Sequence, residues 1–192
     1  MVREGDHIRK PQALVSGWAF EQHILADGRR QILSVLIPGD LIGVRGHQSP
    51  FGSRSIVAAT QVVTCAVPEA DIGTDLEDAY AASAALEKQY LIQQTIRLGR
   101  MTAQERLIDW ILETQARLML AGVVSGNEFA VPLTQELLAD ALGLTNVHVN
   151  RTLQILRRDG LLSFHGGAVS LLDRPRLQSM VGYRAPGRIE TG

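Results

Sequence analysis

The sequence of 192 residues predicts an α+β chain in which antiparallel strands come first and helices follow. Three observations support this order. Short apolar runs alternate with Gly- and Pro-containing turns before residue 75, a proline-free stretch rich in helix formers covers 75–101, and two short capped helices are expected within 133–162. The expected domains are a β-roll over 1–74, a long helix over 75–101 and a helix-turn-helix domain over 102–192.

Residues 3–68 have the pattern of an antiparallel barrel or jelly roll, because the strands are short and no helix separates them. The expected pieces are a strand ending at Gly5-Asp6, a long strand over 13–25 interrupted at Gly17, a turn at 27–30, a strand over 31–37 closed by Pro38-Gly39-Asp40, a polar loop over 45–54, and one long or bent strand over 55–67.

Cys65 is the single cysteine, so neither a disulfide nor a cysteine-only metal or iron–sulfur site can form within one chain. Because it lies in a predicted strand, we expect its thiol to be buried and unreactive. No apolar run is long enough to span a membrane, and the N-terminal residues lack the apolar core of a signal peptide. We therefore expect a cytoplasmic protein without a membrane partner.

Charge is distributed unevenly along the chain, although the formal net charge is only −1. Residues 1–130 carry 12 basic and 15 acidic side chains, whereas residues 131–192 carry seven basic side chains, all arginine, and five acidic ones. A modest positive charge thus coincides with the predicted helix-turn-helix, which is what nucleic-acid binding requires.

The helix expected over 75–101 carries a narrow stripe at steps of three or four residues. Its central members are Ala82, Leu86, Tyr90 and Gln93. So narrow a stripe is typical of a two-stranded coiled-coil seam and predicts a homodimer. Packing of this helix on its own barrel is the alternative. A second amphipathic helix is expected over 102–120.

The segment 133–162 predicts two helices joined by a tight turn. Thr134 and Thr145 are good N-caps, and Gly143 stands where the first helix must end. The apolar positions expected to face the core are Leu137, Leu138, Ala141 and Leu142 in the first helix, and Val149, Thr152, Leu153 and Leu156 in the second.

The opposite face of the second helix is polar but contains neither Glu nor Lys, unlike an ordinary solvated face. Asn and Arg side chains can make paired hydrogen bonds to adenine and guanine edges, which favours a recognition helix in the major groove over a plain helical hairpin. The expected base readers are Asn146, Val147, His148, Asn150 and Arg151.

Residues 161–173 predict two short strands around Gly166-Gly167, which would form the wing of a winged helix with His165 at its tip. The tail over 174–192 is polar and is expected to be loosely ordered at its end.

The segment TQELLADALGLTNVHVNRTLQILRRDGLL resembles the DNA-binding domain of the Crp/Fnr transcription regulators, in the subgroup with a VHVNR-type recognition helix. DGRRQILSVLIPGDLIG resembles the middle of the effector domain of that family, a cyclic-nucleotide-binding-like roll whose N-terminal part is expected to be short or missing here. The resemblance implies a homodimer that binds an inverted repeat in double-stranded DNA, with RNA polymerase as a further partner. It also implies that Arg151 contacts a guanine. Phosphate contacts are expected from Thr134, Thr145, Gln154 and His165.

The resemblance also bears on the effector. In cyclic-AMP binders of this family a Glu holds the ribose and an Arg-Ser pair holds the phosphate. Here Val44 stands at the Glu position, with Arg54 and Ser55 at the other two. Leu91 and Ile92 replace the two hydroxyl-bearing residues that contact the base. We therefore expect no response to cyclic AMP, and Arg54 and Ser55 are left as candidates for an unknown small anionic effector.

The alternative function is a small-anion or metal-binding β-roll of the cupin-like enzyme type with an accessory DNA-binding domain. A metal-dependent cupin needs clustered histidines, but His7, His23 and His47 lie in separate segments. No Ser or Cys nucleophile lies beside an evident base. We therefore expect no catalytic residues, no metal and no cofactor.

Overall fold

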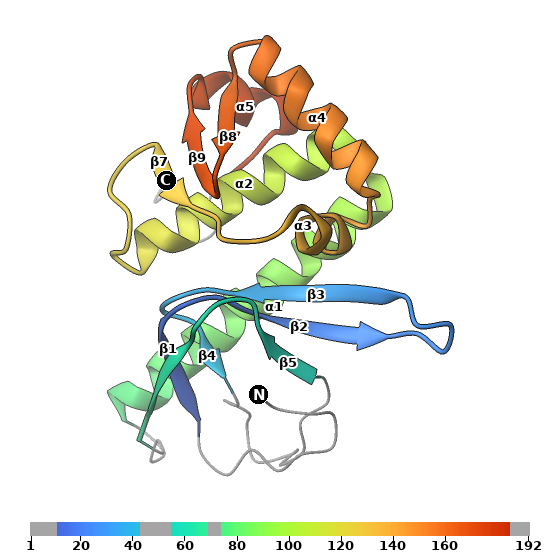
Figure 1. Cartoon of the computed structure of the whole chain (residues 1–192). Helices are drawn as coiled ribbons and strands as arrows, with labels where there is room; N and C mark the ends of the chain where they lie inside the picture. Colours follow the sequence, from blue (N-terminus) through green and yellow to red (C-terminus); the bar gives the residue numbers. More distant parts are fainter. Residues whose placement is uncertain (1–10, 43–54, 69–73, 185–192) are drawn as a thin grey trace. The chain divides into compact units, whose positions relative to one another are not determined.

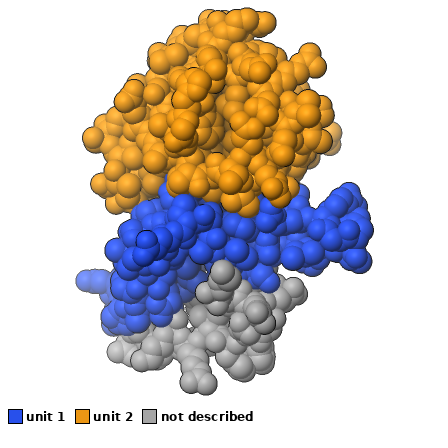
Figure 2. Space-filling view, viewed as in Figure 1, with its two compact units in different colours: residues 1–94 blue, residues 95–192 orange. Residues whose placement is uncertain are grey.

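The structure is a computed structural model of the 192-residue chain and describes residues 11–42, 55–68 and 74–184 (Figure 1). The chain divides into two compact units, residues 1–94 and residues 95–192, which Figure 2 shows in different colours. The boundary falls inside helix α1 (Asp75–Arg100), so the last residues of this helix belong to the second unit.

Among the described residues, the first unit contains two three-stranded antiparallel sheets. In one, β1 (Gln12–Ser16) lies between β4 (Leu41–Ile42) and β6 (Val63–Ala66). In the other, β2 (Ala19–Ile24) lies between β3 (Arg30–Leu36) and β5 (Ser55–Ala58). The antiparallel β-structure expected from the short strands and glycine turns is confirmed.

Gly17 marks the point where the chain passes from one sheet to the other. The sequence predicts one long strand with an interruption here, but the interruption is complete, since β1 and β2 pair in different sheets. Gly17 has φ +84, and a Cβ added to it would lie 2.0 Å from the carbonyl oxygen of Gln61. Only glycine permits both this conformation and this close approach. The strand expected over 55–67 is likewise divided, into β5 and β6.

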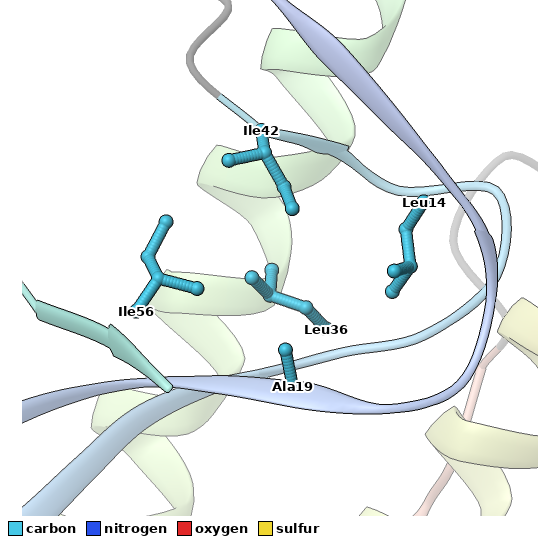
Figure 3. Close-up of a cluster of buried hydrophobic side chains, with 5 residues drawn as sticks. All are labelled: Leu14, Ala19, Leu36, Ile42 and Ile56. Atoms are coloured by element: carbon cyan, nitrogen blue, oxygen red, sulfur yellow. The ribbon is translucent and has the colours of Figure 1, made fainter. Parts of the chain in front are cut away.

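The core of the first unit is formed by one buried side chain from each of five strands, and Figure 3 shows them converging. They are Leu14, Ala19, Leu36, Ile42 and Ile56, with Val62 packed against them. The hairpin between β2 and β3 turns at Gly28, with φ +85. The Pro38-Gly39-Asp40 turn then closes β3, because the Asp40 carboxylate accepts a hydrogen bond of 2.7 Å from the Ile37 amide. Both turns lie where the sequence predicts them.

Cys65 corrects a prediction, because its side chain is exposed rather than buried. It lies on β6, which among the described residues pairs with β1 alone and so forms the edge of its sheet, and every residue of β6 is exposed. An apolar run of this kind is typical of a buried strand, but the run alone does not show whether a second layer covers the strand.

Helix α1 confirms the helix expected over 75–101. Its first turn carries three acidic side chains and its last turn carries Arg97 and Arg100, so the charges at both ends favour the helix dipole. The Thr74 hydroxyl accepts a hydrogen bond from the Glu77 amide, which satisfies one amide of the first turn.

The second unit packs helices against a small antiparallel sheet. Its helices are α2 (Ala103–Leu120), α3 (Gln135–Leu142), α4 (Asn146–Arg158) and α5 (Arg174–Val181), and its strands β7 (Glu128–Ala130), β8 (Leu162–His165) and β9 (Ala168–Leu171) pair in the order β7-β9-β8. Helix α2 agrees with the helix expected over 102–120. It begins with a capping box, in which Thr102 and Glu105 each bond the other's backbone amide.

Two elements of this unit lie where the sequence reading placed none. Strand β7 adds a third strand to the expected two-stranded wing. Helix α5 occupies residues at the start of the segment for which the sequence predicts a polar tail. Asp173 caps α5, Pro175 lies in its first turn, and Leu177 is fully buried against the unit. The cap and the proline were visible in the sequence, but a single buried leucine gives no periodicity.

In the described part of the chain, no helix combines the length and the apolar composition that crossing a membrane requires.

Candidate nucleic-acid interface

Helices α3 and α4 form the helix-turn-helix that the sequence predicts. The Thr134 hydroxyl accepts a hydrogen bond of 3.2 Å from the Leu137 amide, and the Thr145 hydroxyl accepts one of 3.3 Å from the His148 amide. Between the two caps, Gly143 has φ 60 and ψ 41, the left-handed conformation that ends a helix. The three local signals are therefore confirmed.

The inner face of α4 anchors the helix to the unit. Its four buried residues are Val149, Thr152, Leu153 and Leu156, the stripe that periodicity predicts. Helix α4 packs against α2, α3 and β8. This packing leaves the opposite face open to solvent.

That outer face of α4 carries every residue expected to contact DNA from this helix. Exposed side chains are Asn146, Val147, His148, Asn150, Arg151 and Gln154. Val147 is 74% exposed, which is unusual for a valine and leaves its methyl groups free for an apolar contact. The arrangement places short polar side chains and one valine around the N-terminal turns, where a recognition helix meets base edges.

The cations of α4 differ in what they already bind. Arg157 donates a hydrogen bond of 3.4 Å to the carbonyl oxygen of Phe164, and Arg158 pairs with Asp159 at 3.0 Å. Arg151 is exposed and makes no hydrogen bond or ion pair with the described residues. Its guanidinium therefore keeps its full donor capacity for a ligand.

The ring of His148 turns back onto the cap of its own helix. Its Nδ1 lies 3.1 Å from the Thr145 hydroxyl, so this ring nitrogen is already engaged and Nε2 is the one left to face outward. Sequence reasoning grouped His148 with the other polar residues and did not foresee this contact.

The wing is a tight hairpin between β8 and β9. Gly166 and Gly167 have φ +58 and +78, as a two-residue type I′ turn requires, and His165 pairs with Ala168 directly beside the turn. His165 is exposed at the end of β8, as the sequence predicts. The Ser170 hydroxyl donates a hydrogen bond to Glu128, which ties β9 to the additional strand β7.

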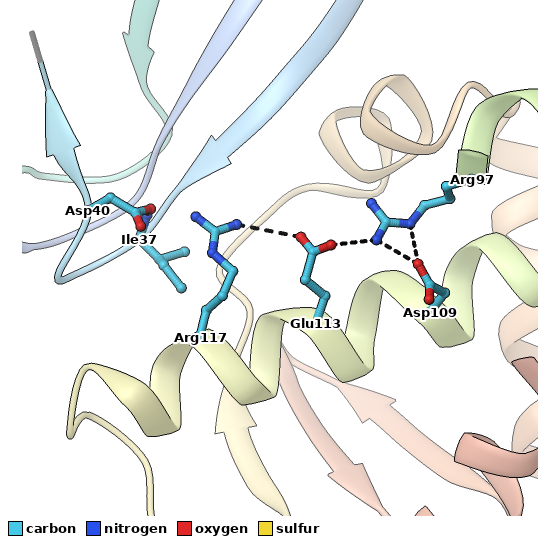
Figure 4. A network of polar contacts seen from close by, with 6 residues as sticks. All are labelled: Ile37, Asp40, Arg97, Asp109, Glu113 and Arg117. Atoms are coloured by element: carbon cyan, nitrogen blue, oxygen red, sulfur yellow. Dashed lines mark hydrogen bonds and ion pairs between the residues drawn. The ribbon is translucent and has the colours of Figure 1, made fainter. Parts of the chain in front are cut away.

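A buried ionic network, which sequence reasoning missed, joins the end of α1 to α2 (Figure 4). The Arg97 guanidinium lies 2.6 Å from the Asp109 carboxylate and 2.7 Å from the Glu113 carboxylate, and all three side chains are buried. Arg117 lies 3.7 Å from the other Glu113 oxygen. The signal is present in the sequence, because Asp109, Glu113 and Arg117 recur every four positions and so share one face of α2.

The expected effector residues are only partly described. Val44, Arg54, His7 and His47 lie outside the described residues. Ser55 is half-buried at the start of β5, where it pairs with Gln22 of β2. The described residues contain no group of three or more His, Cys, Asp or Glu side chains arranged to hold a metal ion.

The expected dimer stripe of α1 has two kinds of environment. Ala82 is exposed, whereas Leu86, Tyr90 and Gln93 are half-buried within the chain itself. Large exposed apolar side chains lie elsewhere on the helix, at Ile92 (50% exposed) and Ile96 (44% exposed).

Comparison with known proteins gives consistent matches. Residues 105–180 match a family model described as a Crp-like helix-turn-helix domain. The nitrogen fixation regulation protein FixK of Azorhizobium caulinodans is 33% identical over 172 residues, which are 87% of this chain and 69% of the relative. The transcriptional activator protein FnrL of Cereibacter sphaeroides is 28% identical over 197 residues, covering 97% of this chain and 79% of the relative.

Among solved structures, that of FixK2 from Bradyrhizobium japonicum superposes with a TM-score of 0.80 at 28% identity, covering 96% of this chain and 93% of that chain. A regulator of the CRP family from Thermus thermophilus has the same fold, with a TM-score of 0.72 at 21% identity over 95% of this chain and 96% of that chain.

Proposed function

This chain belongs to the Crp/Fnr family of DNA-binding transcription regulators, and from this premise we propose that it acts as a homodimer on an inverted-repeat operator. The observation that carries the proposal is the outer face of α4. It is exposed and free of acidic residues, and the opposite face of the same helix is buried in the unit. Two such helices would enter major grooves whose half-site centres lie about one helical turn, roughly 34 Å, apart or a small multiple of it.

Arg151 is proposed to read a guanine in each half-site. Its guanidinium is the cation of α4 that is left without a partner among the described residues, and it can donate two hydrogen bonds to the O6 and N7 atoms of guanine. Such a paired contact is worth about 1–3 kcal/mol of discrimination between bases.

Val147 is proposed to set a second base preference. In the best-known members of the family this position is usually acidic, but a valine cannot accept a hydrogen bond from a cytosine amino group. Its exposed methyl groups can pack against the methyl group of a thymine. Asn146, His148 and Asn150 lie beside it and are proposed as further polar readers.

Contacts to the DNA backbone are proposed for Thr134, Thr145, Gln154 and His165. All four side chains are exposed, at the starts of α3 and α4, along α4 and beside the wing turn. Hydrogen bonds to phosphate fix the register of a protein on the duplex without reading its sequence.

The dimer is proposed to form along α1, with its seam centred on an exposed stripe. Ala82, Ala85, Gln89, Ile92 and Ile96 are spaced by three and four residues, and all are exposed. This spacing is the pattern of a two-stranded coiled coil. The expected residues Leu86, Tyr90 and Gln93 already pack partly within their own chain, so we place them at the margin of the seam.

We further propose that cyclic AMP is not the effector, since an apolar pair, Leu91 and Ile92, occupies the α1 positions that would contact the base. Arg54 and Ser55 stay candidates for binding a different anion.

RNA polymerase is the proposed protein partner of the DNA-bound dimer. The relatives named above are a transcriptional activator protein and a nitrogen fixation regulation protein, which favours regulation over an enzymatic role.

The test is selection of bound DNA from a random pool, followed by binding measurements on single-base variants of the selected operator. We expect an inverted repeat to be enriched. Arg151→Ala should remove the preference at one G·C pair in each half-site while keeping much of the salt-dependent, non-specific binding.

His165→Ala is the matched control, because loss of a phosphate contact should weaken binding to all variants by similar factors. If Arg151→Ala instead weakened every variant equally, the role proposed for Arg151 would be wrong. Failure of the wild-type protein to enrich any sequence would contradict the proposal that it binds a specific operator.

A further inference from the structure

The side chain of Arg106, on α2, joins the ends of two other helices. Its Nε donates to the Met101 carbonyl at 2.9 Å and its Nη2 to the Leu98 carbonyl at 2.9 Å, both at the end of α1. Its Nη1 donates to the carbonyls of Leu142 and Gly143, at 3.1 and 3.3 Å, at the end of α3. Every nitrogen of one guanidinium is therefore committed to a backbone carbonyl.

These carbonyls are the ones that most need a donor. The last four carbonyls of a helix have no partner within the helix, and the C-terminal end carries the negative pole of the helix dipole. A cation placed between two such helix ends is stabilised by the unpaired carbonyls and by the negative dipole pole of each end. The planar fork of arginine can reach several acceptors at once, whereas the single ammonium of lysine cannot hold the same geometry.

The contact between the end of α1, Arg106 and the turn of the helix-turn-helix is also sterically tight. A Cβ added to Gly143 would lie 3.0 Å from the Leu98 side chain and 3.4 Å from the Arg106 guanidinium. The end of α1 therefore touches the turn between α3 and α4, and Arg106 fills the remaining space. All of these contacts lie within the second unit.

We propose that Arg106 is a positioning residue that fixes the direction of the helix-turn-helix relative to the end of α1, and so sets the half-site spacing that the dimer accepts. The inference rests on the proposed function. Because α1 carries the proposed dimer seam, the distance between two recognition helices depends on how rigidly each one is fixed to its own α1. The guanidinium of Arg106 is committed to backbone carbonyls within the second unit, so substituting it should leave the reading of each half-site unchanged.

The experiment uses the full chain and the operator selected from the random pool. Affinities are measured for the selected operator, for operators with one or two base pairs inserted or removed between unchanged half-sites, and for an operator with one substituted base in a half-site. The proteins are wild type, Arg106→Met, Arg106→Lys and Thr102→Ala. Thr102→Ala is the matched control, because it weakens the start of the same helix without touching the guanidinium contacts.

We expect Arg106→Met to lower the affinity ratio between the selected spacing and the altered spacings by about threefold to tenfold, which is what the net contribution of one ordinary hydrogen bond corresponds to. The ratio between the selected and the substituted half-site should stay at the wild-type value. The spacing ratio of Arg106→Lys should lie closer to that of Arg106→Met than to that of the wild type. Thr102→Ala should keep the wild-type spacing ratio. A general loss of folded protein would lower all affinities together and move neither ratio.

The proposal would be overturned if both Arg106 variants kept the wild-type spacing ratio. It would also be overturned if Thr102→Ala lowered that ratio as much as the Arg106 variants do. If the wild-type protein enriches no operator, the proposed function fails and this inference fails with it. A wild-type protein that enriches an operator, together with Arg106 variants of unchanged spacing preference, would refute the inference alone.

Discussion

The buried network around Arg97 predicts a large and specific loss of stability. In Arg97→Met the methionine keeps much of the side-chain volume but removes the cation that lies 2.6 Å from Asp109 and 2.7 Å from Glu113. The two carboxylates are 1% and 5% exposed, so water cannot replace the lost partner. Breaking a buried ion pair by removing one partner costs about 3–5 kcal/mol of unfolding free energy.

A loss of this size is a large part of the stability of a typical domain, which is about 5–15 kcal/mol. For a urea slope of about 2 kcal/mol/M, it should lower the unfolding midpoint of the second unit by about 2 M. The chain offers a clean probe, because it has two tryptophans, Trp18 in the first unit and Trp110 in the second, and both are buried. Trp110 fluorescence in a Trp18→Phe background therefore follows the second unit.

Two further variants separate the charge effect from simple repacking. Asp109→Asn added to Arg97→Met should recover part of the stability, because a neutral amide costs less to bury than a carboxylate without its cation. Asp159→Asn removes an exposed ion pair of the second unit, Arg158–Asp159 at 3.0 Å, and should change the unfolding free energy by less than about 1 kcal/mol. If Arg97→Met costs no more than Asp159→Asn, the network is not desolvated and the reasoning fails.

Three other outcomes are expected. Ile92→Lys should place a charge in the proposed α1 seam and give monomers, so an unchanged dimer mass by light scattering would refute that seam. Hydrogen bonds from the backbone amide and the hydroxyl of Thr102 lower the pKa of Glu105, so the stabilisation of α2 by the capping box is present above the ordinary carboxyl pKa and is lost as the pH falls through the lowered one. Thr102→Ala keeps the amide but removes the hydroxyl, so it should raise that pKa part of the way in a carbon-detected titration, and no change would contradict the contribution of the hydroxyl. Gly17→Ala should destabilise the first unit more than Gly28→Ala. Both glycines have φ near +85, but a Cβ at Gly17 would also clash with the carbonyl oxygen of Gln61, whereas a Cβ at Gly28 would meet no atom within 4 Å. Equal losses of unfolding free energy in urea would exclude that clash as the reason.

The helix-turn-helix could be predicted from the sequence because its determinants are local. Thr134 and Thr145 cap helices that begin at the next residue, and Gly143 ends a helix through its own backbone conformation. Exposure of the α4 outer face followed from the buried stripe on its other side. None of these features depends on a distant part of the chain.

The features that the sequence did not reveal depend on distant neighbours. The complete break at Gly17 is enforced by the carbonyl of Gln61, far along the chain. The exposure of Cys65 follows from its strand lying at a sheet edge, which no local pattern indicates. Helix α5 is held by one buried residue, Leu177, whose environment is made by other elements.

The arginines of the second unit show most clearly why residue type alone does not define the site. Arg97 is buried between two carboxylates, Arg106 is committed to four carbonyls, and Arg157 binds a carbonyl of the wing strand β8. Counting them as positive charge overstates what the unit offers to DNA, because a guanidinium already bonded must give up those bonds to reach a phosphate. Arg151, exposed and without a partner among the described residues, gives up none. Affinity of this protein for DNA should therefore depend less on its net charge than on the outer face of α4, which makes the sequence preference, rather than the salt dependence, the more sensitive measure of its function.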